Sequence, residues 1–221
     1  MIRVVGDSHI MLFAGITDAK ELVEPVGLLP THNPNDKLME FETYHVKLLR
    51  AYWIEKVIGL IKFLPQSAPI ILSAGEIDCR GPILNIYHRE KRFIKDIVKD
   101  CVDRYLLGVN HLRDQGWNII MYSPVPNRFI NEEVSPDYAI PEYLSPSLWC
   151  LLKQQAVIHF DGLIKESGMP VISLVDWIVD ENISHDARYW WDTAHVNESV
   201  WPQLKLEFEK QGIELTLERR E

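Results

Sequence analysis

Three short polar clusters hold the side chains of this sequence that could act together in a reaction. They are Gly6-Asp-Ser-His9, Gly75-Glu-Ile-Asp-Cys-Arg80 and Asp192-Thr-Ala-His195. A serine hydroxyl is a weak nucleophile until a neighbouring base removes its proton, and histidine does this near neutral pH. The histidine in turn needs a carboxylate that fixes its tautomer and stabilises the imidazolium. Ser8, His195 and Asp192 are therefore of the types that nucleophilic acyl transfer requires.

Each cluster also has a simpler interpretation. Asp192 stands three residues before His195, so one helical turn would place both on the same side and pair them. Alternatively, Asp192 caps the last helix and His195 is a solvated side chain. Asp7 or Ser8 can likewise serve only as a helix cap, a role that these residue types often have.

The clusters fall at, or just after, the ends of predicted strands. Residues 2–5 are a short β-branched run that stops at Gly6, and residues 68–73 are a continuous apolar run between breakers. The second pattern is typical of a strand that is buried on both faces of a sheet. In an open parallel sheet ligands bind outside the carboxyl ends of the strands. We therefore expect the clusters to meet at that edge, although they are far apart in sequence.

The remaining pattern alternates between strands and helices. Further strands are predicted at 22–26, 117–122 and 170–174, with a possible edge strand at 213–217; helices are predicted at about 38–64, 90–114, 147–167 and 198–211. This alternation predicts an α/β fold with right-handed crossovers. About five parallel strands suit a flavodoxin-like, three-layer α/β/α sandwich, although the pattern does not give the strand order.

Length and composition favour one globular domain that spans residues 1–221. The chain has no visible tandem repeat, and its formal net charge of −9 argues against binding to nucleic acid or to an anionic membrane surface. The proline-rich segment 123–146 has no clear periodicity, so we interpret it as a functional loop or lid. The sequence does not predict an oligomeric state.

The three cysteines, Cys79, Cys101 and Cys150, support neither a disulfide framework nor a zinc motif. The first predicted strand follows Met1 directly, without a basic leader or an apolar run long enough to span a bilayer. A cytoplasmic location is the expectation from these features.

In this order and spacing, the motifs Gly6-Asp-Ser8, Gly75-x-x-Asp78 and Asp192-x-x-His195 resemble those of the SGNH/GDSL hydrolases, across nearly the whole chain. The resemblance implies a flavodoxin-like sandwich that hydrolyses esters, and sometimes thioesters, without a metal or other cofactor. It makes Ser8 the nucleophile, His195 the general base and Asp192 its orienting partner. It also implies three oxyanion donors: the N–H of Ser8, a glycine after the second strand, for which Gly27 is the candidate, and an asparagine in the middle motif.

The middle motif departs from the family pattern, because Ile77 stands where the family has that asparagine. An isoleucine side chain donates no hydrogen bond, and the loss of one oxyanion donor typically costs about 2.7–4 kcal/mol of transition-state stabilisation. Arg80 is the candidate replacement, because a guanidinium offers several donors and a fixed charge for the oxyanion or for an acidic substrate group. Gly75, Asp78 and His9 complete the candidate oxyanion or substrate-binding set. The alternative for Glu76, Asp78 and Arg80 is a structural salt-bridge cluster that supports the Ser8 loop.

Two other functions stay open at this point. Without the asparagine, the domain could be a binding module that keeps the fold but has little or no activity. Asp7-x-His9 also resembles the first motif of a dinuclear metallophosphoesterase, but the Gly-Asn-His motif usual there does not occur. For an esterase, Arg80 with Trp190 and Trp191 favours a small polar or carbohydrate ester, such as an O-acetyl ester, as the substrate.

Overall fold

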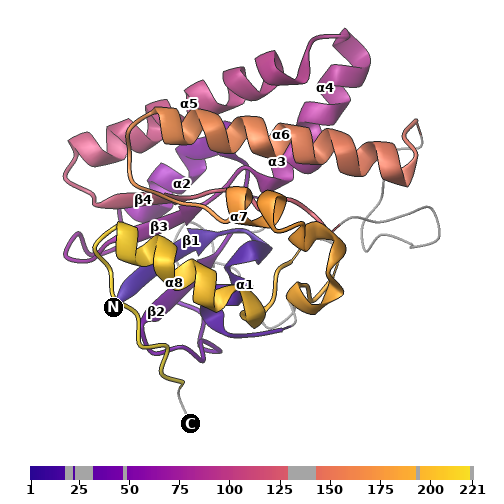
Figure 1. Ribbon diagram of the computed structural model, residues 1–221. Coiled ribbons are helices and arrows are strands. Elements are labelled where there is room, and N and C mark those ends of the chain that lie inside the picture. The colour runs from indigo at the N-terminus through magenta and orange to yellow at the C-terminus, as the bar shows by residue number, and fades with distance from the viewer. Residues whose placement is uncertain (18–21, 23–31, 47–48, 129–142, 193–194, 220–221) are drawn as a thin grey trace.

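The computed structural model describes residues 1–17, 22, 32–46, 49–128, 143–192 and 195–219, except for the side chains of Ser8 and Trp53. A five-stranded sheet runs through the described part of the chain (Figure 1). Its strands are β1 (Ile2–Gly6), β2 (Phe41–His45), β3 (Ile70–Ser73), β4 (Ile119–Tyr122) and β5 (Val171–Ile172). All pairs are parallel and the order is β2-β1-β3-β4-β5. This is the flavodoxin-like order, and the predicted α/β class is confirmed.

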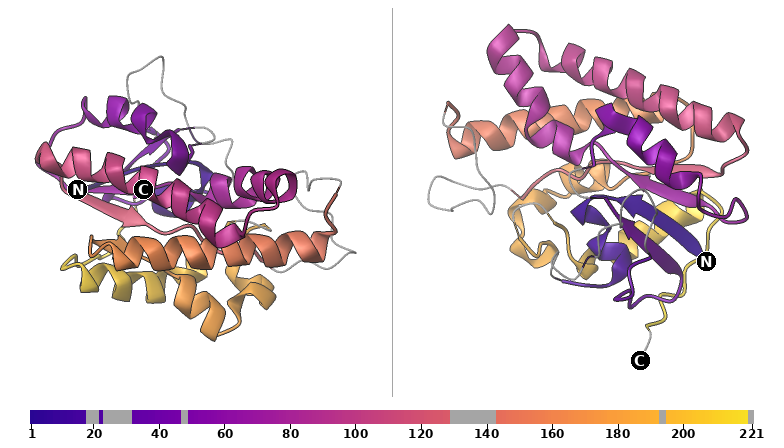
Figure 2. Two further views of the ribbon diagram at one scale, coloured as in Figure 1. Left: turned by 90° about the horizontal axis from the view of Figure 1, so that it is seen from above. Right: turned by 180° about the vertical axis from the view of Figure 1, so that it is seen from behind.

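Helices cover both faces of the sheet. They are α1 (Met11–Ala14), α2 (Ile54–Ile61), α3 (Glu76–Arg80), α4 (Pro82–Glu90), α5 (Ile94–Asp114), α6 (Pro146–Glu166), α7 (Val175–Asp180) and α8 (Trp201–Lys210). The long helices α5 and α6 lie side by side, and α8 lies on the opposite side of the sheet (Figures 1 and 2). The described part of the chain also has short 3₁₀ turns, at Ser8–Ile10, Ala51–Trp53, Ile183–His185, Ala187–Tyr189 and Glu198–Val200.

The alternation of side chains along each strand divides the apolar core into two clusters. Val5, Leu72 and Met121 pack with α2, α5 and α6, whereas the preceding residues Val4, Ile71 and Ile120 pack with α1 and α8. Successive side chains of a strand point to opposite faces, so each strand contributes to both layers. The result is a three-layer α/β/α sandwich, as predicted.

The second strand is not where the sequence pattern placed it. Residues 41–45 lie within the helix that we predicted at 38–64, yet they form β2, and only 54–61 form the α-helix. In β2, Phe41, Thr43 and His45 are buried and the two residues between them are half-buried, which is the period of two of a strand. Most of the strand predicted at 22–26 lies outside the described residues, and Leu22 belongs to no strand.

Two other boundaries differ from the prediction. The helix expected at 90–114 begins at Ile94, and a separate helix, α4, precedes it. Lys91 ends α4 in a left-handed conformation (φ 56°). The chain therefore changes direction between α4 and α5, although the sequence pattern predicts one helix there. Residues 213–217 form no strand and continue as irregular chain after α8.

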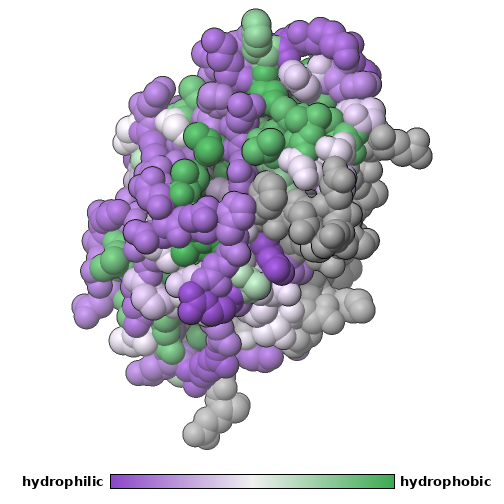
Figure 3. Space-filling view, turned by 45° about the vertical axis from the view of Figure 1, so that its right-hand side comes forward, coloured by the Kyte–Doolittle hydropathy of each residue, from purple (hydrophilic) through white to green (hydrophobic). Residues whose placement is uncertain are grey.

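Residues 129–142 of the predicted loop or lid lie outside the described part, so its role stays a prediction. At its end, the ring of Tyr143 stacks on His88 of α4 with 3.7 Å between centroids. In the coloured part of the face drawn in Figure 3, hydrophilic residues predominate and hydrophobic patches lie between them. Among the described helices, none combines the length and the apolar character that a membrane crossing needs.

Candidate active site

The turn that carries Ser8 lies at the carboxyl end of β1, an inner strand of the sheet between β2 and β3. Gly6, the last residue of β1, pairs in register with Ser73 at the end of β3. A Cβ atom on Gly6 would lie 2.7 Å from the Cβ of Ser73 and 2.6 Å from the Cγ2 of Ile10, so only glycine fits there. The chain then enters a 3₁₀ turn at Ser8, at the sheet edge where ligands of such folds bind.

Asp192 and His195 form a close carboxylate–imidazole pair. The Nδ1 of His195 lies 2.6 Å from the Oδ2 of Asp192, and the backbone N–H of His195 donates to Oδ1 at 2.7 Å. The pair sits in a tight loop and not in a helical turn: Trp190 and Val196 form an antiparallel bridge, and the N–H of Trp191 donates to the carbonyl of His195. The pairing that we derived from helical spacing therefore has a different structural basis.

The ring of His9, the residue after Ser8, contacts the Asp192–His195 pair. Its ring lies against the ring of His195, with 4.6 Å between centroids and an interplanar angle of 38°. Both rings line a narrow recess, together with Met11, Tyr122, Val125, Trp191 and Val196. His9 is therefore a buried residue of the candidate site and not a surface residue. The hydroxyl of Tyr122, at the end of β4, is buried there and has no hydrogen-bond partner in the described part of the chain.

His9 also belongs to a buried ionic cluster. Its Nδ1 and its backbone N–H both lie 3.0 Å from the Oδ1 of Asp7. Burial disfavours the imidazolium, but the carboxylates of Asp7 and Glu76 outweigh this effect, so the pKa of His9 is raised. Burial also opposes the charge of Glu76, but the cation Lys153 and then His9 and Arg80 hold the pKa of this carboxyl well below its usual range.

Lys153 is a site residue that the sequence analysis missed. It lies on α6 with its side chain fully buried, and its Nζ is 2.6 Å from the Oε1 of Glu76. The signal was present in the sequence, because Trp149, Lys153, Ala156 and Phe160 follow a helical spacing of three and four residues. A lysine within such an apolar stripe indicates a buried partner of opposite charge.

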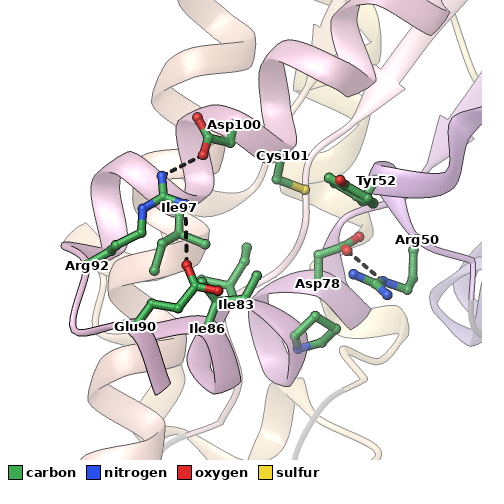
Figure 4. Close-up of a pocket in the computed structure, with 11 residues that line it drawn as sticks. Arg50, Tyr52, Asp78, Ile83, Ile86, Glu90, Arg92, Ile97, Asp100 and Cys101 are labelled. Atoms are coloured by element: carbon green, nitrogen blue, oxygen red, sulfur yellow. Dashed lines mark hydrogen bonds and ion pairs between the residues drawn. The ribbon is translucent and has the colours of Figure 1, made fainter. Parts of the chain in front are cut away.

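Asp78 points away from the recess and binds the segment before α2. The Nε of Arg50 donates to its Oδ1 at 2.9 Å, and the N–H of Ala51 donates to its Oδ2 at 2.6 Å. Burial raises the pKa of Asp78 in spite of these bonds. Asp78 lines a second pocket, of about 300 Å³, between this segment, α4 and α5, whose charged residues include two Asp–Arg pairs (Figure 4). This pocket is larger than the recess, but none of the residues that line it comes from the Ser8 or His195 clusters.

The other candidate residues are distributed as follows. Gly75 adopts φ 107°, and a Cβ there would lie 2.6 Å from the Cζ of Phe160, so it allows close packing of α3 on α6. The guanidinium of Arg80 lies 3.7 Å from the Oε2 of Glu76, which is the salt-bridge arrangement that we kept as an alternative. A contact of Arg80 with the oxyanion stays a prediction. Gly27 lies outside the described residues.

The fold and this site together define a doubly wound α/β sandwich with a serine turn and an Asp–His pair at the carboxyl edge of its sheet. The sequence itself matches no protein-family profile and no curated protein.

Solved structures share the fold. A GDSL-like lipase from Bacteroides thetaiotaomicron is 11% identical, over 95% of this chain and 86% of that chain, with a TM-score of 0.53. An acetyl xylan esterase is 11% identical over 96% of this chain and 100% of that chain, with a TM-score of 0.51. An extracellular lipase from Streptomyces rimosus is 9% identical over 96% and 99%, also with a TM-score of 0.51. The chain therefore has the fold of GDSL-type lipases and esterases.

Proposed function

We propose that this protein is a serine esterase in which Ser8 is the nucleophile, His195 the general base and Asp192 the residue that orients His195. The observation that carries the proposal is the Asp192–His195 pair, whose imidazole packs 4.6 Å from the ring of His9, the residue next to Ser8. Since Nδ1 of His195 faces the carboxylate, Nε2 is the nitrogen that takes the proton of the serine.

The reaction then proceeds in two halves. The Ser8 hydroxyl gives its proton to His195 as its oxygen bonds to the ester carbon, and the alcohol leaves with that proton when the carbon–oxygen bond breaks. A water molecule then gives a proton to His195 as its oxygen bonds to the acyl carbon. The bond from that carbon to the Ser8 oxygen breaks, Ser8 takes the proton back from His195, and the acid is released. The N–H of Ser8 is the first oxyanion donor, because the first N–H groups of a helical turn have no partner within it.

The substrate that we propose is a small polar ester, with an O-acetyl group on a carbohydrate as the preferred case. The recess between His9, Tyr122, Trp191 and His195 is too narrow for a long acyl chain, so we propose the smallest acyl group, bound at the entrance of the recess. Trp191, which is half-buried, offers an aromatic surface beside it on which a sugar can pack. The fold shared with an acetyl xylan esterase is in keeping with this choice.

A panel of 4-nitrophenyl acetate, butyrate and octanoate together with an acetylated xylo-oligosaccharide tests the proposal. We expect the acetyl esters to have the highest kcat/KM, Ser8→Ala to abolish turnover, and Asp192→Asn to lower kcat at least about 100-fold. Ser199→Ala, at an exposed serine, is the matched control. Unchanged turnover in Ser8→Ala would refute the mechanism.

Two further measurements separate the alternative functions. A fluorophosphonate probe should label Ser8 stoichiometrically; a folded protein that takes up no label would be a binding module. Activity should survive EDTA, whereas an activity that EDTA removes and Mn²⁺ or Zn²⁺ restores would favour the metallophosphoesterase.

A further inference from the structure

Three buried residues meet beneath the Ser8 turn with unused hydrogen-bonding capacity. Asp7, His9 and Glu76 are 1%, 7% and 2% exposed, and one ligand atom from each lies within 4.8 Å of the others. Among the described residues, one buried polar atom of each has no hydrogen-bond partner: Oδ2 of Asp7, Nε2 of His9 and Oε2 of Glu76, the last of which has the guanidinium of Arg80 3.7 Å away. Such buried polar groups need a compensating charge or proton.

The charges around the cluster favour a proton over a metal ion. Two carboxylates belong to the cluster, Asp7 and Glu76, and Lys153 and Arg80 supply two cations that already bind Glu76. The carboxylate left for a further charge is that of Asp7, and a proton on His9 pairs with it at 3.0 Å. A divalent metal would instead leave an excess positive charge close to two buried or half-buried cations, which is unfavourable in a low dielectric.

We propose that His9 is a positioning residue of this site: as an imidazolium held by Asp7 and Glu76, it fixes the Ser8 turn against α3 and supports the ring of His195. The inference rests on the proposed function and extends it. Asp7 and His9 flank Ser8 in the chain, and one atom of each lies within 4.8 Å of a carboxylate oxygen of Glu76. The attraction between a charged His9 and Glu76 therefore acts on the backbone that carries the nucleophile. Glu76 is in turn held by Lys153, which connects the turn to α6.

The arrangement makes the site sensitive to alkaline pH. The groups that face His9 are Asp7 in its own turn, Glu76 and Arg80 on α3, Lys153 on α6, Tyr122 on β4, and His195 with Asp192 in the carboxyl-terminal loop. Because the pKa of His9 is raised by folding, its contribution to stability is complete below the unfolded value of about 6.5 and is lost as the pH rises through the folded value.

His9→Gln tests the proposal, because glutamine keeps a hydrogen-bonding side chain but cannot carry the charge. We expect kcat for 4-nitrophenyl acetate to fall about 10- to 100-fold, as for a small displacement of reacting groups, while KM changes less than about threefold. The rate at which the fluorophosphonate labels Ser8 should fall in parallel. His159→Gln, on the exposed side of α6, is the matched control.

The pH profile separates this role from a purely structural one. Wild-type kcat/KM should decline on the alkaline side as His9 loses its proton, and His9→Gln should lack that decline. Glu76→Gln, which removes one of the carboxylates that favour the imidazolium, should move the decline to lower pH. It also keeps the test valid if His9→Gln does not fold.

The outcomes distinguish this inference from the proposed function. If wild-type activity requires Ser8 but His9→Gln keeps both kcat and the alkaline decline, the role of His9 is wrong and the esterase stands. If activity does not require Ser8, the esterase itself is wrong. If EDTA abolishes a Ser8-dependent activity and Zn²⁺ restores it only when Asp7, His9 and Glu76 are intact, a metal and not a proton occupies the cluster.

Discussion

Asp78→Ala distinguishes a structural from a catalytic role for the acid of the middle motif. The carboxylate of Asp78 is 1% exposed and accepts hydrogen bonds from the Nε of Arg50 and the N–H of Ala51. It faces the pocket between α4 and α5 and not the recess with His195 (Figure 4). We therefore expect the substitution to reduce stability and to leave the chemical step nearly unchanged in the molecules that remain folded.

The expected loss follows from the two bonds. Ala51 is fully buried, so its N–H would lose its acceptor in a place that water does not reach, at a cost of about 1–3 kcal/mol. The guanidinium of Arg50 is 19% exposed and regains part of its hydration, so its share is smaller, about 1–2 kcal/mol. A total near 3 kcal/mol corresponds to a decrease in Tm of about 6–12 °C for a domain of this size.

Urea and thermal unfolding, combined with turnover per folded molecule, measure both quantities. Asp100→Ala is the matched control, because Asp100 lines the same pocket and also pairs with an arginine, Arg92, but its side chain is 59% exposed. That variant should lose less than about 1 kcal/mol. If Asp78→Ala keeps the wild-type unfolding free energy and loses its activity, the structural role is refuted and Asp78 takes part in the reaction.

Two further substitutions test the packing of α3 on α6. Gly75→Ala should lower the unfolding free energy by at least about 2 kcal/mol in urea denaturation, because the added Cβ would lie 2.6 Å from the Cζ of Phe160 at φ 107°; a fully stable variant would contradict this geometry. Lys153→Met should cost about 3–5 kcal/mol because it leaves the carboxylate of Glu76 buried without its closest cation. Adding Glu76→Gln to Lys153→Met should recover part of that loss, and additive losses in the double variant would show that the two residues are not coupled.

Much of the fold was predictable because its strands and helices have clear periods. The apolar run at 68–73 predicted a buried strand of the sheet, and the long apolar stripe of α5 predicted a helix packed on it. The prediction failed where a strand resembles part of a helix: Phe41, Thr43 and His45 alternate over only five residues and adjoin the apolar stripe of α2. Pairing with β1, which no local pattern encodes, decides that these residues are a strand.

The candidate site was predictable in part for a similar reason. The motif residues are polar side chains at strand ends, and the register of β1 with β3 brings the first two clusters together. Lys153 was not predictable in the same way, because it lies in the middle of α6, far from every motif in sequence. Its role depends on the packing of α6 on α3, which only the tertiary structure defines.

The two acids of the middle motif serve opposite sides of the site, and the geometry of a helix explains why. Glu76 and Asp78 are two positions apart in α3, so their side chains point about 200° apart around its axis. Glu76 therefore reaches Lys153 and the cluster beneath the Ser8 turn, while Asp78 reaches Arg50 and Ala51. The short helix α3 thereby holds the Ser8 turn on one side and the segment before α2 on the other. Ile77, which lies between the two acids, is half-buried and offers no side-chain donor. The predicted oxyanion donor of this helix therefore stays Arg80, and Glu76 contributes to the proposed reaction by positioning the backbone that carries Ser8.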